Sequence, residues 1–258
     1  MDTSTAAGAT ERTTLLRNRP AARRLHATVY LLTAFLAFSG VAVSGEGRPS
    51  LEDLLGGHET TAASHRWIGF LLIGVLLLVA AVRPVAIGRF IAESVRIRAR
   101  EINWFKTWPR FVLRPRRNAP SRHEGHFDPG QRAFNLVVVV SFLALAVSGV
   151  VMSLPERFTQ KAFAVSFDVH VVATVVLVVA VAGHIAIASG VLNAYRGVGR
   201  AMHLGGWVRA DLARRLWPRW AEAQERDAPL LRVRTSAHGD TDQPTDREGG
   251  DGGRGADQ

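Results

Sequence analysis

Four histidines lie within, or at the start of, long apolar segments: His26, His65, His170 and His184. Ionisable side chains are costly inside a membrane, so such histidines are candidates for a functional site. A neutral imidazole keeps one ring nitrogen free to bind a metal, and it is a common axial ligand of haem iron. We therefore interpret these four residues as metal ligands. The other five histidines lie in polar segments, and we expect them to be solvated.

His170 and His184 stand fourteen residues apart in one apolar segment. Each residue of an α-helix turns about 100° and rises about 1.5 Å, so the two imidazoles share a face and differ by about 21 Å in depth. A single helix would then offer two ligands at two depths. A lone histidine at the end of a membrane helix is a simple interfacial residue about as often as it is a functional one. The interfacial interpretation therefore stays open for His26 and His65.

The elements that would position these histidines are four stretches without Asp, Glu, Lys or Arg. A helix that spans a bilayer needs about 20 mainly apolar residues. The charge-free stretches are residues 25–45, 67–82, 133–155 and 169–195. We expect spanning helices over about residues 25–45, 65–87, 132–154 and 168–195. The sequence thus predicts an all-α integral membrane protein with a bundle of four transmembrane helices at residues 25–195.

The segments outside this bundle differ in composition. Residues 1–24 are basic, and residues 196–227 combine arginines with tryptophans, which favours a cytoplasmic amphipathic helix at the membrane surface. Within the long middle connection, residues 93–105 predict another interfacial helix. Residues 228–258 are rich in Gly, Asp, Arg and Thr, so we expect a disordered tail there.

Basic residues are distributed unevenly over these segments. From the N-terminus, the five segments outside the apolar stretches hold 5, 2, 12, 2 and 11 Lys and Arg. Because basic short loops stay in the cytoplasm, we expect both termini and the middle loop inside, and the protein in the cytoplasmic membrane. The net charge of +10 then lies beside the membrane, and we expect no nucleic acid partner. The chain has no Cys, so it cannot itself bind an iron–sulfur cluster through thiolates.

This orientation pairs the histidines by depth. His65 and His170 both begin their helices at the outer surface, whereas His26 and His184 lie toward the inner surface. Two bis-histidine sites stacked in a helix bundle are expected of a protein that carries electrons across a membrane on two b haems. The alternative is a haem-free membrane anchor or small transporter, whose histidines would serve packing or proton movement.

Several segments resemble one family in their order and spacing. They are ARRLHATVYLLTAFLAFSG, SHRWIGFLLIGV, FDPGQRAFNLVVVVSFLALAVSGVVM and DVHVVATVVLVVAVAGHIAIA. Together with the tail segment that ends in WPRWAEA, they resemble the cytochrome b (gamma) subunit of respiratory formate dehydrogenases over about residues 20–223. The cytochrome b subunits of nickel–iron hydrogenases are similar more distantly. The resemblance implies an outer haem b on His65 and His170 and an inner haem b on His26 and His184.

The resemblance also implies a quinone site beside the inner haem. Menaquinone or another quinone would bind near the turn that precedes the third helix, where Asp128, Gly130 and Gln131 match the family's motif. Asp128 replaces the family's Asn. An Asn can donate a hydrogen bond to a quinone carbonyl, whereas an ionised Asp can only accept one. The alternative for Asp128 is a carboxylate that caps the third helix.

The resemblance further implies an electron source outside this chain. An iron–sulfur beta subunit and a molybdenum or tungsten alpha subunit that oxidises formate would reduce the outer haem. The chain would be the electron-transfer subunit that passes these electrons to quinone near the cytoplasmic side. A hydrogenase, a thiosulfate or polysulfide reductase, and other quinone-linked oxidoreductases stay open as partners, because fold and cofactor do not decide the partner.

Overall fold

A computed structural model of the chain describes residues 14–44, 49–96, 98–115, 117–118 and 122–227. Four long apolar helices dominate it: α1 (Pro20–Ser44), α3 (His58–Val82), α6 (Pro129–Ser153) and α7 (Gln160–Ala188). The shortest have 25 residues, which gives a length of about 37 Å and exceeds the roughly 30 Å of a bilayer's hydrocarbon core. The predicted fold class, a helical membrane protein with four spans, is confirmed.

Local signals explain where these helices begin and end. The Asp128 carboxylate accepts a hydrogen bond from the Gln131 backbone N–H and so caps the start of α6. Thr159 caps α7 in the same way. The second span was expected over residues 65–87, but α3 ends at Val82. Pro84 follows and starts a separate helix, because proline cannot continue the hydrogen-bond ladder of the preceding helix.

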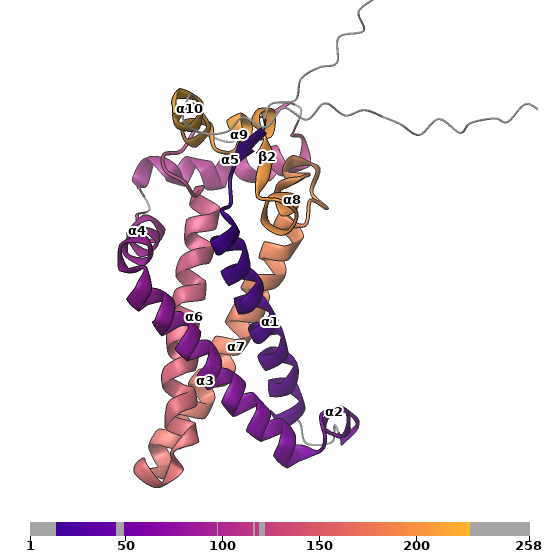
Figure 1. Cartoon of the computed structure of the whole chain (residues 1–258), viewed down its shortest axis with the longest axis vertical. Coiled ribbons are helices and arrows are strands. Elements are labelled where there is room, and N and C mark those ends of the chain that lie inside the picture. Colours follow the sequence, from indigo (N-terminus) through magenta and orange to yellow (C-terminus); the bar gives the residue numbers. More distant parts are fainter. Residues whose placement is uncertain (1–13, 45–48, 97, 116, 119–121, 228–258) are drawn as a thin grey trace, which may run out of the picture.

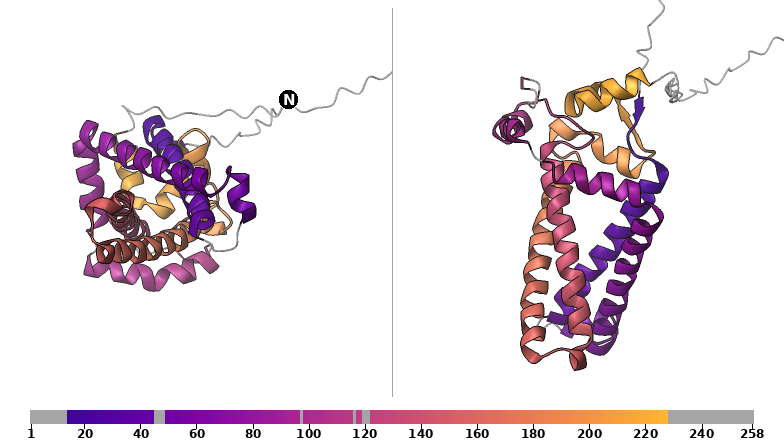
Figure 2. Two further views of the ribbon diagram at one scale, coloured as in Figure 1. Left: turned by 90° about the horizontal axis from the view of Figure 1, so that it is seen from below. Right: turned by 90° about the vertical axis from the view of Figure 1, so that its left-hand side faces the viewer.

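The four spans form two antiparallel hairpins. Helix α1 packs along α3, and α6 packs along α7, whereas contacts between the two hairpins are sparse (Figure 1; Figure 2). Within the membrane-crossing parts of the spans, the buried side chains are mainly small: Ser39, Ala42, Thr61, Leu72, Ser141, Ser148, Ala173 and Leu177. The first turns of α6 add the buried residues Pro129, Arg132 and Asn135. Many large apolar side chains of the spans are exposed, above all on α7, as expected for surfaces that face lipid.

One end of the bundle is covered by a set of short elements that we call the cap. Its members are β1 (Thr14–Leu16), α5 (Ile102–Leu113), α8 (Val198–His203), β2 (Trp207–Arg209), α9 (Ala210–Leu216) and α10 (Pro218–Arg226). The strands pair antiparallel, with Leu15 opposite Val208. Phe111, Tyr195 and Leu216 belong to the buried cluster that holds the cap together. Figure 1 shows the cap at the end of the bundle opposite the α6–α7 turn.

Residues 196–227 are not the single amphipathic helix that we expected. The structure divides them into α8, β2, α9 and α10. Gly197, Gly205 and Gly206 have φ values of 98°, 103° and 91°, which side-chain-bearing residues rarely adopt and which interrupt a helix. Pro218 then separates α9 from α10. The interruptions let this segment fold back onto β1 and α5.

Shorter elements connect the main helices. They are α2 (Pro49–Leu54), α4 (Pro84–Ser94), η1 (Ala99–Glu101), η2 (Pro155–Arg157) and η3 (Asn193–Tyr195). Part of the interfacial helix expected at residues 93–105 is thus present as η1 and the first turn of α5. The expected disordered tail at residues 228–258 and the first 13 residues of the basic N-terminal segment lie outside the described residues.

Candidate functional site

The end of the bundle away from the cap brings His65 and His170 together. His65 lies on α3 and His170 on α7, and their ring centres are 6.3 Å apart with an interplanar angle of 63°. The two imidazoles come from different hairpins. They therefore face each other where the hairpins make few direct contacts.

A serine from the neighbouring helix orients each of these imidazoles. His65 Nδ1 is 2.9 Å from Ser39 Oγ, and His170 Nδ1 is 2.9 Å from Ser148 Oγ. Ser39 Oγ donates its one proton to the Phe35 carbonyl oxygen at 2.8 Å. The serine can then only accept from the imidazole, so Nδ1 carries the proton and Nε2 keeps its lone pair. Nε2 is the nitrogen left free to bind a metal.

The same arrangement occurs in both hairpins. Ser148 Oγ donates to the Ala144 carbonyl oxygen at 2.6 Å, just as Ser39 donates four residues back. Each serine precedes a glycine that makes room for the ring. A Cβ added at Gly40 would lie 3.2 Å from His65 Cε1, and one at Gly149 would lie 3.4 Å from His170 Cε1. Sequence reasoning did not predict that these serines orient the imidazoles.

His26 and His184 meet at the capped end. Their ring centres are 6.5 Å apart, and the Phe134 ring stacks on His184 at 4.4 Å with an interplanar angle of 7°. A third imidazole, that of His203 in α8, lies 5.8 Å from the His26 ring centre. Arg23 holds α8 here by donating to the carbonyl oxygens of residues 202 and 203, both at 2.8 Å. Sequence reasoning missed His203, because its segment is polar.

The separation within each pair fits a shared iron ion. Two imidazoles that bind one metal ion from opposite sides have ring centres about 6 Å apart, because each metal–nitrogen bond is about 2.0 Å and each nitrogen lies about 1.1 Å from its ring centre. The observed 6.3 and 6.5 Å agree with that separation. Each pair supplies two nitrogens, the number that an iron takes in addition to the four of a porphyrin. The residues present therefore fit a haem at each end.

Residues 17–202 match the sequence family described as prokaryotic cytochrome b561. The chain belongs to this family. It is therefore a multi-pass membrane haem protein of the cytochrome b561 type that transfers electrons, and its family associates with membrane-bound oxidoreductases. No curated relative matches the chain. The match covers all four spans and ends just before His203.

In this cytochrome b561-type bundle, the three residues expected at a quinone site lie at the start of α6. Asp128 is the N-cap, as the alternative interpretation had it, and burial raises the pKa of its carboxyl group. The Gln131 side-chain amide donates to Asn135 Oδ1 at 2.8 Å. Trp104 covers Gly130 so closely that an added Cβ would lie 2.8 Å from its ring. Gln131 lies one turn before Phe134, whose ring stacks on His184.

Three residues near Asp128 were not expected at the site. Arg17 donates to His126 Nδ1 at 3.0 Å and to the His126 carbonyl oxygen at 2.6 Å. Burial lowers the pKa of Arg17 to about 9. Burial, together with the Arg17 charge, lowers the pKa of His126 to about 3. His123 is also buried, with Nε2 2.9 Å from the Leu216 carbonyl oxygen.

The expectation that His123 and His126 are solvated is therefore wrong, because the loop before α6 folds under the cap. Arg17 shows the same enclosure, since its guanidinium lies 4.1 Å from the centre of the Trp217 ring and 4.4 Å from that of Trp220. Nothing in the local sequence around these residues indicates burial. The residues that enclose the two histidines, Arg17, Leu216 and Trp220, are distant from them in sequence.

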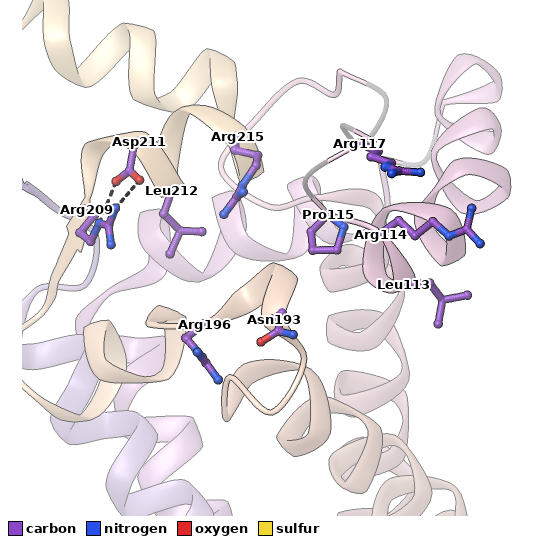
Figure 3. A pocket seen from close by; sticks show the side chains of 10 residues that line it. All are labelled: Leu113, Arg114, Pro115, Arg117, Asn193, Arg196, Arg209, Asp211, Leu212 and Arg215. Atoms are coloured by element: carbon purple, nitrogen blue, oxygen red, sulfur yellow. Dashed lines mark hydrogen bonds and ion pairs between the residues drawn. The ribbon is translucent and has the colours of Figure 1, made fainter.

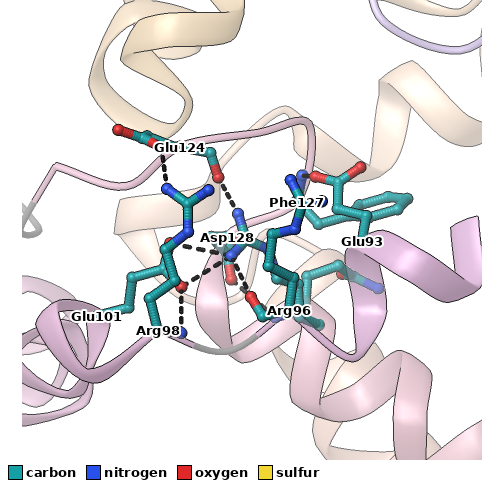
Figure 4. A network of polar contacts seen from close by, with 9 residues as sticks. Glu93, Arg96, Arg98, Glu101, Glu124, Phe127 and Asp128 are labelled. Carbon is teal, nitrogen blue, oxygen red and sulfur yellow. Dashed lines mark hydrogen bonds and ion pairs between the residues drawn. The ribbon is translucent and has the colours of Figure 1, made fainter. Parts of the chain in front are cut away.

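A polar network fixes the turn that carries Asp128 (Figure 4). Arg132 donates to both carboxylate oxygens of Glu101 at 2.9 and 2.8 Å, and both side chains are only 3% exposed. Glu93 accepts from the Phe127 backbone N–H at 2.8 Å. Gly125 has φ 97°, and a Cβ there would lie 2.5 Å from Glu93 Oε1. The network thus ties α4 and η1 to the first turn of α6.

Proposed function

We propose that the chain carries electrons across the membrane with one haem b held at each histidine pair. His65 and His170 would hold the haem iron at the uncapped end, and His26 and His184 would hold that at the capped end. When bound, the haems supply the one-electron redox chemistry. The observation that carries the proposal is the matched separation of the two imidazole pairs at opposite ends of one bundle.

The histidines and serines of the chain perform the positioning. Ser39 and Ser148 hold each Nδ1–H, so that both Nε2 atoms are presented without a proton. A hydrogen bond from Nδ1–H also raises the basicity of the ligating nitrogen. Helix α7 contributes one histidine to each pair, and the fourteen-residue spacing of His170 and His184 sets the separation of the pairs along the membrane normal.

We further propose that quinone is reduced beside the His26–His184 pair, on the cytoplasmic side. Gln131, one turn before the residue that stacks on His184, supports this location. Asp128 supports it as well, because burial raises the pKa of its carboxyl group and a protonated carboxyl group can donate to a quinone oxygen. Gly130 then acts through packing, since Trp104 covers it.

The electron source we propose is an outer formate dehydrogenase with iron–sulfur and molybdenum or tungsten subunits. The resemblance of the spans and of the segment ending in WPRWAEA supports it. The experiment is to add formate or hydrogen to membranes that contain the native complex and to record haem reduction. Reduction by formate supports the proposal, whereas reduction by hydrogen alone assigns the chain to a hydrogenase.

The haem arrangement itself is tested on purified protein. A dithionite-reduced minus oxidised spectrum with a haem count should give two b haems per chain. His170→Ala and His184→Ala should each lose a different haem, because they belong to different pairs. Full haem content in both variants would reject these ligands. A well-folded wild-type protein without haem, when haem was supplied, would leave the anchor or transporter alternative.

A further inference from the structure

A basic pocket opens at the capped end of the bundle, separate from both histidine pairs. It is a hollow of about 980 Å³ between α5, η3 and α9. Five arginines and one acidic residue line it: Arg114, Arg117, Arg196, Arg209, Arg215 and Asp211. Figure 3 shows Arg196 and Arg215 on opposite sides of the space, with Arg114 and Arg117 along one edge.

The charge in this pocket is not neutralised within the described part of the chain. Asp211 pairs with Arg209 at 2.6 and 2.9 Å. The other four arginines form no ion pair with any residue that the structure describes. Four guanidinium groups around one hollow make a strong site for an anion, and a phosphate suits them because guanidinium can bind its oxygens bidentately.

The surface beside the pocket is apolar and lies at the end of the spans. Leu113, which ends α5, is 80% exposed, and Val191, three residues after α7, is 79% exposed. Ile102, Phe105 and Leu113 are all exposed on α5 and lie within about 80° of one another around the helix. Helix α5 runs across the end of the bundle (Figure 1), so this stripe would face the acyl region beside the spans.

We infer that the pocket binds the phosphate headgroup of an anionic phospholipid. The arginines would hold the phosphate, and the acyl chains would run past Leu113 and Val191 into the bilayer. A basic pocket next to an exposed apolar stripe at the membrane surface matches both halves of such a molecule. A soluble phosphate would use only the arginines. The site does not depend on haem or quinone, so its test is independent of the proposed function.

The test uses the full-length protein, purified in detergent and observed by native mass spectrometry. It is titrated with phosphatidylglycerol, with phosphatidylcholine of the same acyl chains, or with inorganic phosphate. The pocket variant carries Arg196→Gln and Arg215→Gln. The matched control carries Arg200→Gln and Arg226→Gln, which remove the same charge from exposed positions outside the pocket. Circular dichroism and size exclusion check that each variant is folded.

We expect wild-type protein to bind phosphatidylglycerol at least tenfold more tightly than phosphatidylcholine. The pocket variant should lose at least about tenfold in affinity for phosphatidylglycerol, since each arginine near the surface contributes several-fold, and the control should stay within about twofold. Equal losses of affinity in both variants would mean that the lipid is bound by general charge attraction, and this result would overturn the proposed site. Displacement of the lipid by millimolar inorganic phosphate would assign the pocket to a soluble anion. If the pocket variant misfolds, Arg114→Gln with Arg117→Gln replaces it, with the same expected loss.

Discussion

At the scale of single residues, the serines that orient His65 and His170 have measurable consequences. Removing the Ser148 hydroxyl takes away the acceptor for His170 Nδ1–H and makes the ligating nitrogen less basic. We expect Ser148→Ala to raise the midpoint potential of the haem at this end by about 40 mV, the equivalent of one hydrogen bond of about 1 kcal/mol. Redox titration followed by absorbance would measure it.

The control for that change is Ser153→Ala. Its hydroxyl donates to the Gly149 carbonyl oxygen on the same helix and touches neither imidazole in the described contacts. Both potentials should stay unchanged in the control, and the potential at the capped end should stay unchanged in Ser148→Ala. A shift of both haems in either variant would contradict a local role for the serine.

His126 predicts a pH dependence of stability. Its folded-state pKa of about 3 lies below the usual 6.5, so the folded protein binds fewer protons than the unfolded chain between these values. The stability associated with neutral His126 is therefore fully present above pH 6.5 and is lost as the pH falls toward 3. We expect His126→Gln to flatten the fall in melting temperature between pH 6.5 and 4. If melting temperature falls with pH at the same rate in wild-type protein and in His126→Gln, other groups control the pH dependence of stability.

At the scale of elements, the cap depends on α5 to hold its other members together. Phe111 is fully buried in the cluster that joins α5 to η3 and α9. Truncating a buried phenylalanine to alanine costs about 3–5 kcal/mol, so Phe111→Ala should loosen the packing of α9 and the other cap elements against α5. Limited proteolysis should then cut within residues 196–227 much faster than in wild-type protein.

The matched control is Phe105→Ala on the same helix, where the side chain is 41% exposed. It should leave the proteolysis rate close to that of wild-type protein. The haem at His65 and His170 should persist in both variants, because these residues lie at the other end of the bundle. Loss of that haem in Phe111→Ala would mean that the cap and the bundle fold as one unit.

At the scale of the whole molecule, the orientation in the membrane is a prediction from the loop charges alone. The chain contains no Cys, so each introduced cysteine is the only thiol. We expect Arg157→Cys, in the α6–α7 connection, to react with a membrane-impermeant maleimide in intact cells. Arg200→Cys, in α8, should react only after the membrane is opened. The reverse pattern would place the cap outside and invert the direction of electron transfer.

The four spans, and the placement of their histidines in two pairs, follow from local sequence. Charge-free stretches long enough to cross a bilayer have few structural alternatives, and a fourteen-residue spacing on one helix needs only helical geometry. The structure of the cap cannot be predicted from local sequence in this way. Strand β1 pairs with a strand almost 200 residues later. His123 is buried and His126 is partly buried by segments that local patterns do not connect to them.

The residues proposed for the quinone site show what a sequence motif leaves undetermined. Asp128, Gly130 and Gln131 are adjacent in sequence, but their environments differ: a helix cap, a tryptophan contact and an amide pair. Which of them can meet a ligand depends on Trp104 and Asn135. The position of Trp104 against the motif results from tertiary packing, because it comes from a different helix.

The repeated Ser-Gly contact makes the two hairpins near-equivalents around His65 and His170. An electron that enters there would meet two halves that share the same serine and glycine contacts. The capped end is different, because His203, Phe134 and the buried Asp128 each lie on one side only. The direction of the route would then originate at the capped end, and the repeated Ser-Gly contact alone would give the route no built-in exit.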